Sequence, residues 1–249
     1  MKARGEKIAV LTAYDYPTAR LLDEGGIDLL LVGDSVGMVV LGYPDTTLVT
    51  LDEMVHHTRA VARGAQRSAI MADLPIATYD TPSQAVESAR RLADAGAHAV
   101  KLEGGASHVA QIRALVAADI PVMAHIGMQP QRVRIEGGYR MKGKTNEDAE
   151  RLIEDAVAVQ EAGSFGLLLE LVHPETSRRI TETIRIPTIG IGAGTACDGQ
   201  VLVTHDLIGL FPWFTPKFVN PAANISQQIR EAAAEFIRRT KQPLPAEPA

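Results

Sequence analysis

Four acidic side chains occur where short apolar segments of the sequence end. Asp34 ends IDLLLVGD, Asp73 lies near the end of SAIMADLP, Glu103 lies in HAVKLEG and Glu170 lies in GLLLELV. If these segment ends meet in the fold, four carboxylates would repel one another unless a cation lay among them. Carboxylate oxygens suit Mg²⁺, which binds through one or two protein carboxylates and keeps several waters. The pattern therefore predicts a divalent-metal site.

Two basic side chains accompany these acids. Lys101 lies in the same segment as Glu103, and His125 lies in IPVMAHIG. Because an unpaired charge is costly to bury, Glu170 and Lys101 should each have a partner or a tuned role in acid–base chemistry. The structural alternative for Lys101 is a salt bridge to Glu103 or Asp73. His125, taken alone, is better explained as a hydrogen-bonded core histidine.

Asp15 and Asp34 also have a structural alternative. Asp15 ends the first apolar segment, IAVLTAYD, just as Asp34 ends the second. A single Asp after a strand is most often a helix N-cap or a turn residue. Neither residue can therefore be assigned to a site from its position alone, and both interpretations stay open.

Eight apolar segments could bring these residues together. They are apolar at consecutive positions rather than alternating, which is typical of strands buried on both faces of a parallel sheet. Eight strands with intervening helices favour a closed α/β barrel, the (β/α)8 or TIM barrel, over an open sheet, and the polar ends would then meet at its C-terminal mouth. The segments begin at Ile8, Ile27, Ser68, His98, Ile120, Gly166, Ile186 and Gln200.

Helical patterns and long connections separate these segments. Thr81 is expected to cap a helix that runs to Ala95, a second helix covers 146–162, and a third covers 222–239. The connections 35–50 and 127–144 both follow strands, so in a barrel both would lie at the mouth. Connections of this length are often functional lids.

The composition indicates one soluble domain. The chain has 249 residues and a net charge of -5, and only 4% of its residues are aromatic, which argues against nucleic-acid and anionic-membrane surfaces. One cysteine, no apolar run of membrane-spanning length and no signal peptide favour a cytoplasmic protein. We expect a single barrel domain over 1–241 and a disordered, Pro-rich tail over 242–249.

At these residues the sequence resembles the ketopantoate hydroxymethyltransferase family. The matching stretches are spread in order over most of the chain, and as a set they are far more specific than any single motif. They are Leu11–Tyr16, Leu31–Met38, Ala72–Pro75, Val100–Gly105, His125–Gly127, Gly137–Tyr139, Gly190–Gly194 and Asp198–Gln200. The resemblance implies a barrel of the phosphoenolpyruvate mutase and isocitrate lyase type.

The resemblance also implies roles at matching positions. Asp34 and Asp73 look like Mg²⁺ ligands, with Glu103 completing the metal site directly or through water; both aspartates would thereby also contact the chelated substrate. Ser35 resembles the residue that holds the substrate carboxylate, and Lys101 the cationic partner of the bound keto acid. Glu170 matches the general base, and His125 a further substrate-site residue.

The implied reaction is a hydroxymethyl transfer. With one Mg²⁺ per subunit, Glu170 would remove the proton beside the ketone of 3-methyl-2-oxobutanoate, and the metal-stabilised enolate would attack 5,10-methylenetetrahydrofolate. The product would be 2-dehydropantoate, which leads to pantothenate. A Schiff base on Lys101 ranks lower, because a lysine beside metal ligands should stay charged. The resemblance also implies a homo-oligomer, a decamer.

Other interpretations stay open. Another Mg²⁺-dependent 2-keto-acid enzyme, a carbon–carbon lyase or mutase, would not need tetrahydrofolate, and a silent barrel would not bind Mg²⁺.

Only about ten residues precede the first motif where family members usually have a helical segment, which leaves closure of the barrel floor open. The connection 131–144 is either a solvated charged loop or a lid for the acidic tail of folate; its cations are Arg132, Arg134, Arg140, Lys142 and Lys144.

Overall fold

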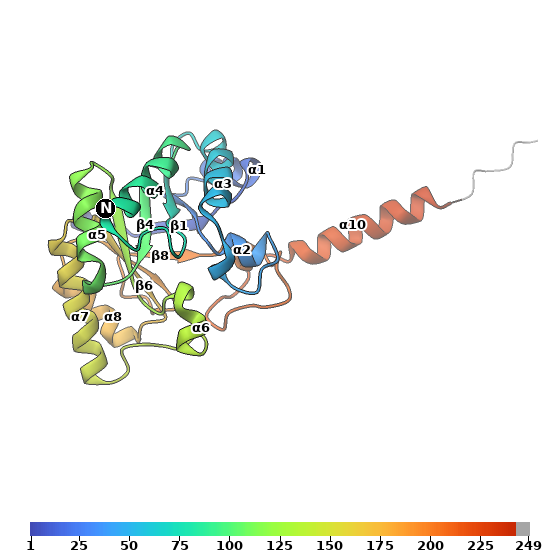
Figure 1. The fold of residues 1–249 in the computed structure, drawn as a ribbon. Helices are drawn as coiled ribbons and strands as arrows, with labels where there is room; N and C mark the ends of the chain where they lie inside the picture. The colour runs from blue at the N-terminus through green and yellow to red at the C-terminus, as the bar shows by residue number, and fades with distance from the viewer. Residues whose placement is uncertain (243–249) are drawn as a thin grey trace, which may run out of the picture. The chain divides into compact units, whose positions relative to one another are not determined.

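The computed structural model describes residues 1–242 and contains a closed barrel of eight parallel strands (Figure 1). Each strand pairs with the next in sequence, and β1 pairs with β8 to close the ring. All eight predicted strands are present, which confirms the barrel. They are β1 Ile8–Thr12, β2 Leu29–Val32, β3 Ala69–Asp73, β4 Ala99–Glu103, β5 Val122–Gly127, β6 Gly166–Glu170, β7 Thr188–Ile191 and β8 Gly199–Leu202.

Helices connect most of the strands. The helix predicted after Thr81 is α4, and the Thr81 side chain accepts a hydrogen bond from the backbone N–H of Gln84 as an N-cap. Residues 192–198 join β7 to β8 without a helix. The helices are α1 Tyr16–Glu24, α2 Val36–Val39, α3 Leu51–Gly64, α4 Pro82–Asp94, α5 Val109–Ala117, α6 Val133–Glu136, α7 Asn146–Glu161, α8 Pro174–Thr183, α9 Thr204–Leu207 and α10 Ile225–Thr240, with 3₁₀ turns η1 Lys2–Arg4, η2 Thr46–Leu48, η3 Ala106–His108 and η4 Pro130–Arg132.

Alternation along the strands divides the apolar core into two layers. Successive side chains of a strand point to opposite faces, so one set faces the barrel interior and the other faces the helices. The interior set comes from the strands alone, whereas the outer set packs against helices. The interior set consists of Val10, Leu29, Leu31, Met71, Ala99, Met123, Leu168, Ile189 and Val201.

The first residues of the chain contact the floor of the barrel. The Lys2 ammonium donates hydrogen bonds to the carbonyl oxygens of Thr181, Ile184 and Ile186 at 3.0–3.1 Å, and it lies 2.9 Å from Asp198 Oδ2. These carbonyls lie at the end of α8 and in the turn before β7, opposite the mouth. A cation at the C-terminus of a helix is favourable because the free carbonyls there carry partial negative charge. The turn η1 is thereby fixed at the floor.

The described residues form two compact units, each considered by itself. The first, Met1–Leu202, contains the barrel, and the second begins at Val203. In the second unit, α10 begins after the N-cap Asn224, three residues later than predicted, because the Asn224 side chain accepts the backbone N–H of Gln227. The single domain over 1–241 stays a prediction, and the tail from residue 243 onward lies outside the described residues.

Within residues 1–242, no helix combines the length and the apolar character that crossing a bilayer requires.

Candidate active site at the barrel mouth

Strand register places the predicted polar residues side by side. Asp73 of β3 is the register partner of Lys101 of β4, and Glu103 of β4 is the partner of His125 of β5. Because Ala99, two residues before Lys101, faces the interior, Lys101 and Glu103 face it as well. Lys101 Nζ lies 3.2 Å from Asp73 Oδ1 and 3.4 Å from His125 Nδ1. The salt bridge considered for Lys101 is therefore present, and it lies inside the predicted site.

Glu170 completes this group from the end of β6. Its carboxylate Oε2 lies 3.5 Å from His125 Nε2, and its side chain is 17% exposed. The next residue, Leu171, has a φ of 47°, which is strained for a leucine and typical of functional turns. Gly127 of β5 allows the close approach of the two strands, since a Cβ on it would lie 2.3 Å from the Glu170 carbonyl oxygen.

Asp34 and Ser35 enter the mouth from the end of β2. The backbone N–H of Asp34 donates to Asp73 Oδ2 at 3.0 Å, so the two aspartates are adjacent. Ser35 Oγ lies 2.8 Å from the Tyr14 hydroxyl. Gly33 makes room for this packing, because a Cβ there would lie 2.9 Å from Ser35 Oγ. Both predicted residues therefore belong to the same cluster.

Asp15 has the structural role considered for it. Its carboxylate accepts the backbone N–H of Thr18 at 2.8 Å and caps α1. Asp15 is exposed, whereas Asp34 is buried beside Asp73. The capping interpretation is confirmed for Asp15, and Asp34 caps no helix.

The cluster also contains two buried polar residues, Gln131 and Tyr79, which the sequence did not indicate as site residues. The amide of Gln131, in η4 after β5, donates to Asp34 Oδ2 at 2.8 Å, and the Gln131 backbone N–H donates to Glu103 Oε2 at 3.1 Å. The Tyr79 hydroxyl donates to Gln131 Oε1 at 2.5 Å. Both residues lie in connections between strands and helices, where neither periodicity nor charge marks them as buried.

Burial raises the pKa of every carboxyl group in the cluster. Burial and the neighbouring Asp73 raise the pKa of Asp34 to about 7, and burial raises that of Asp73 despite the opposing effect of Lys101. Burial and the charge of Asp34 raise the pKa of Glu103 well above its usual range. Burial raises the pKa of Glu170 to about 8. Glu170 is thus a stronger base than an exposed glutamate.

The two basic groups shift in opposite directions. Burial lowers the pKa of Lys101, but Asp73, Glu103 and Asp34 outweigh it, so the net shift is upward and Lys101 stays charged. Burial and the charge of Lys101 lower the pKa of His125 well below its usual range, so His125 is neutral. An ammonium can only donate, so the contact with Lys101 makes Nδ1 the acceptor and assigns the imidazole hydrogen to Nε2, which faces Glu170.

The donor set fits a hard cation. Four carboxylates face one ammonium, and Asp73 Oδ1 is buried and accepts no hydrogen bond within residues 1–242, although Lys101 Nζ lies 3.2 Å away. No three His, Cys, Asp or Glu side chains of the described chain form a ready metal cage. Mg²⁺ needs no such cage, because one or two carboxylates, water and substrate can complete its coordination. The adjacent pair Asp34 and Asp73 meets that requirement.

The two long connections after β2 and β5 contact each other at the mouth. The Arg134 guanidinium forms a two-point ion pair with Asp45 at 2.8 and 3.2 Å. Lys142 pairs with Glu136 within the second connection. A polar cavity of about 240 Å³ lies between this connection and α7 and reaches Gly127 at the end of β5; Arg132, Lys142, Arg151, Glu136, Asp148 and Asp155 are among its lining residues.

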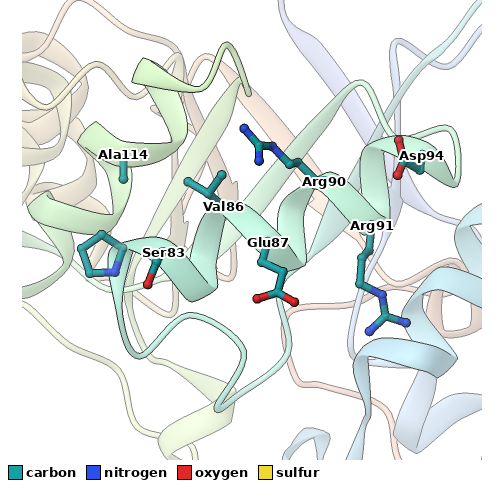
Figure 2. A pocket seen from close by; sticks show the side chains of 8 residues that line it. Ser83, Val86, Glu87, Arg90, Arg91, Asp94 and Ala114 are labelled. Carbon is teal, nitrogen blue, oxygen red and sulfur yellow. The ribbon is translucent and has the colours of Figure 1, made fainter.

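A second cleft lies on the helix layer (Figure 2). It has a volume of about 520 Å³, and none of the mouth residues lines it. Its walls carry both charge signs and come mainly from α4, with Ala114 of α5 opposite. The chemistry predicted from the sequence therefore lies at the barrel mouth and not in this cleft.

Comparisons with known proteins place this chain among relatives of one family. The family model of ketopantoate hydroxymethyltransferase matches residues 1–246. The 3-methyl-2-oxobutanoate hydroxymethyltransferase of Syntrophus aciditrophicus is 51% identical over 97% of this chain and 89% of its own, and that of Chloroflexus aurantiacus is 53% identical over 95% and 84%. A solved 2,3-dimethylmalate lyase, described as a member of the phosphoenolpyruvate mutase/isocitrate lyase superfamily, shares the fold with a TM-score of 0.65 at 19% identity, covering 100% of this chain and 88% of its own.

Proposed function

The chain belongs to the ketopantoate hydroxymethyltransferase family, and we propose that it transfers a hydroxymethyl group from 5,10-methylenetetrahydrofolate to 3-methyl-2-oxobutanoate, giving 2-dehydropantoate. The observation that supports this most is the cluster of Glu170, Lys101 and His125 beside the adjacent carboxylates Asp34 and Asp73. It combines a base of raised pKa, a buried cation and oxygen ligands, which are the groups that enolate formation from a 2-keto acid needs.

Each residue has a definable part in this reaction. Glu170 accepts the proton from C3, and neutral His125 packs beside the Glu170 carboxylate, with Nε2 3.5 Å from Oε2. Charged Lys101 offsets the negative charge of the keto acid, and Ser35 holds the substrate carboxylate. A Schiff base on Lys101 is disfavoured, because its raised pKa leaves almost no free amine to act as a nucleophile.

We propose Mg²⁺ as the cofactor, held by Asp34 and Asp73, with Glu103 near the site. When bound, the ion would polarise the keto group and offset the charge that develops on the enolate. Glu103 is already engaged by the Gln131 backbone N–H, and its Oε1 lies 3.7 Å from His125 Nδ1. A direct ligand role for Glu103 Oε2 would break the hydrogen bond from Gln131, so coordination through water suits that oxygen better.

A product assay tests the function. Formation of 2-dehydropantoate should require both Mg²⁺ and 5,10-methylenetetrahydrofolate. The rival lyase or mutase would instead consume a keto-acid substrate without any folate. Turnover without folate would favour the rival, and failure to bind any divalent cation would favour a silent barrel.

The raised carboxyl pKa values predict how Mg²⁺ and pH act on stability. In metal-free protein Asp34 and Glu170 hold protons up to about pH 7 and 8, whereas the unfolded chain releases them near pH 4. The free energy of unfolding should therefore fall as pH rises from about 4.5 to 8. Mg²⁺ at a hundredfold excess over its Kd should add about 2.7 kcal/mol at pH 8, raising the Tm by roughly 5–10 °C.

Calorimetry at pH 5.5 and pH 8, with MgCl₂ or with NaCl of matched ionic strength, measures this effect. The Mg²⁺-induced rise in Tm should be larger at pH 8, since protons compete with the cation at pH 5.5. A rise that is absent, or equal at both pH values, would contradict a metal site built from these carboxylates.

We propose that folate approaches over the polar cavity beside β5. This cavity reaches the end of a mouth strand, and it is lined in part by the connection 127–144. Of the five cations in that connection, Arg134 and Lys142 are already paired with carboxylates. Arg132, Arg140 and Lys144 form no ion pair within residues 1–242, so they are the ones free to meet the acidic tail of folate.

Neutralising Arg132, Arg140 and Lys144 to glutamine should raise the KM for 5,10-methylenetetrahydrofolate about tenfold, at about 0.5 kcal/mol for each exposed cation. The KM for the keto acid should not change. Steady-state kinetics at low ionic strength measure both constants. An Arg178→Gln variant, which removes an exposed cation of α8, provides the control. Equal rises in both KM values would eliminate a specific role in folate binding.

We also propose the homo-oligomer implied by the resemblance. The supporting observation is α10, on which Ile229, Phe236 and Ile237 recur at helical spacing and are exposed in the single chain. Burial of this face against another copy of the chain would remove apolar surface from water. Light scattering after size exclusion determines the number of subunits, and a monomer at micromolar concentration would exclude the assembly.

A further inference from the structure

The connection after β5 buries the side chain of Gln131 against the carboxylate cluster, while neighbouring side chains of the connection stay exposed. Gln131 is 4% exposed, whereas Arg132 and Arg134 on the same connection are exposed. A primary amide has two donor hydrogens and one carbonyl acceptor, and burying them without partners costs free energy. The contacts of this amide therefore help to hold the connection at the mouth, together with the ion pair between Arg134 and Asp45.

The Gln131 amide has one possible orientation in this hydrogen-bond network. The Tyr79 hydroxyl also lies 3.3 Å from the carbonyl oxygen of Glu103, and it donates to Gln131 Oε1 at 2.5 Å. The Gln131 Nε2 then donates to Asp34 Oδ2 at 2.8 Å and to the Leu74 carbonyl at 3.0 Å. Exchanging the oxygen and nitrogen would place two acceptors against each other at the Leu74 carbonyl, which can only accept, so the network assigns this orientation.

Gln131 links carboxylates from two different strands. Its side chain holds Asp34 at the end of β2, and its backbone N–H holds Glu103 at the end of β4. A hydrogen bond to one oxygen of a carboxylate fixes the rotation of that group. Partners of this kind around metal ligands set ligand orientation, and removing one typically weakens metal binding about 10–100-fold.

We infer that Gln131 is a positioning residue, which orients Asp34 for the cation and fastens the connection 127–144 to the cluster. Tyr79 acts through Gln131, because its hydroxyl reaches the amide and not Asp34. Tyr79 is itself supported by Gln111 of α5, whose Nε2 donates to the Tyr79 carbonyl at 3.3 Å, and by the ring of His108. This inference rests on the proposed function, since it assumes that Asp34 binds the cation.

Mn²⁺ binding to the full chain, followed by electron paramagnetic resonance without substrate, tests the inference. Gln131→Met keeps the side-chain length but removes the amide, and it should weaken Mn²⁺ binding about 10–100-fold. Tyr79→Phe should weaken it by a smaller factor. The double variant should bind no more weakly than Gln131→Met alone, because coupled residues are not additive.

Gln160→Met is the matched control. The Gln160 side chain accepts backbone N–H groups of Arg185 and Ile186 at the barrel floor, so its loss affects stability but not the mouth. It should leave Mn²⁺ binding unchanged. Trypsin cleavage after Arg132 or Arg134 in metal-free protein gives a second readout, and Gln131→Met and Tyr79→Phe should accelerate it.

The outcomes separate this inference from the proposed function. Mn²⁺ binding within threefold of wild type in a folded Gln131→Met protein would overturn the inference, and so would wild-type protein that binds no Mn²⁺. If Gln131→Met does not fold, Tyr79→Phe decides: unchanged Mn²⁺ binding and unchanged cleavage would overturn it. Wild-type protein that binds Mn²⁺ but forms no 2-dehydropantoate would refute the proposed function and leave the role of Gln131 standing.

Discussion

Replacing Glu170 with glutamine is expected to slow deuterium exchange at C3 of 3-methyl-2-oxobutanoate by about 10²–10⁴-fold, the usual contribution of a general base. The amide nearly matches the carboxylate in shape but cannot accept the proton. Proton NMR in deuterated buffer with Mg²⁺ and without folate measures the exchange directly. It therefore isolates the proton transfer from the later attack on the one-carbon donor.

The pH dependence of the deuterium exchange provides a second test of Glu170 as the base. A base acts in its deprotonated form, and burial raises the pKa of Glu170 to about 8 in metal-free protein. Mg²⁺ would lower this pKa, because it offsets the charges of Asp34 and Asp73. Exchange by the wild type should therefore rise with pH through the neutral range, and the variant should lack this rise. Glu175→Gln, at the exposed start of α8, is the matched control and should exchange like wild type. Exchange retained within tenfold in Glu170→Gln would assign the base to another residue.

Replacing Lys101 with methionine is expected to lower the free energy of unfolding by about 3–5 kcal/mol at pH 8, as when one partner of a buried ion pair is removed. Lys101 and Asp73 are 5% and 3% exposed, and Lys101 is the ammonium group among the four carboxylates of the mouth. Without it, those carboxylates repel one another in a medium that screens them poorly.

The loss should shrink at low pH, because carboxyl groups that hold protons no longer need a counter-charge. Urea unfolding of metal-free protein at pH 5.5 and pH 8 gives both values. Lys144→Met, on the exposed connection after β5, is the control and should change stability by less than about 0.5 kcal/mol. A destabilisation by Lys101→Met that does not depend on pH would mean that the side chain acts through packing and not through charge.

The sequence carried most of the information on the barrel and its mouth, for a physical reason. Asp73, Lys101 and Glu170 are charged residues inside apolar strands, and burial of a charge is costly enough to mark it as functional or paired. In a parallel barrel the C-terminal ends of strands meet, so residues at those ends become neighbours without further information. The structure confirms the strands and brings these residues together.

The parts that could not be predicted depend on tertiary contacts. Gln131 and Tyr79 meet across 52 positions of sequence, and nothing local to either residue indicates burial. Asp15 and Asp34 both follow strands, and only the path of the chain decides that one caps α1 while the other lies against Asp73. The predicted start of α10 at residue 222 is three residues early, because the Asn224 side chain caps the helix, which begins at Ile225.

The pairing of β1 with β8, which closes the barrel, affects folding during synthesis of the chain. Ile8 pairs with Gly199 and Leu11 with Leu202, so the first strand acquires its second neighbour only when the last strand has been synthesised. At about 5–20 residues per second, a nascent chain would carry the unpaired edge of β1 for roughly 10–40 s. Such an edge can pair with other chains. The yield of folded protein should therefore depend on protection of this edge during synthesis as well as on the stability of the finished barrel.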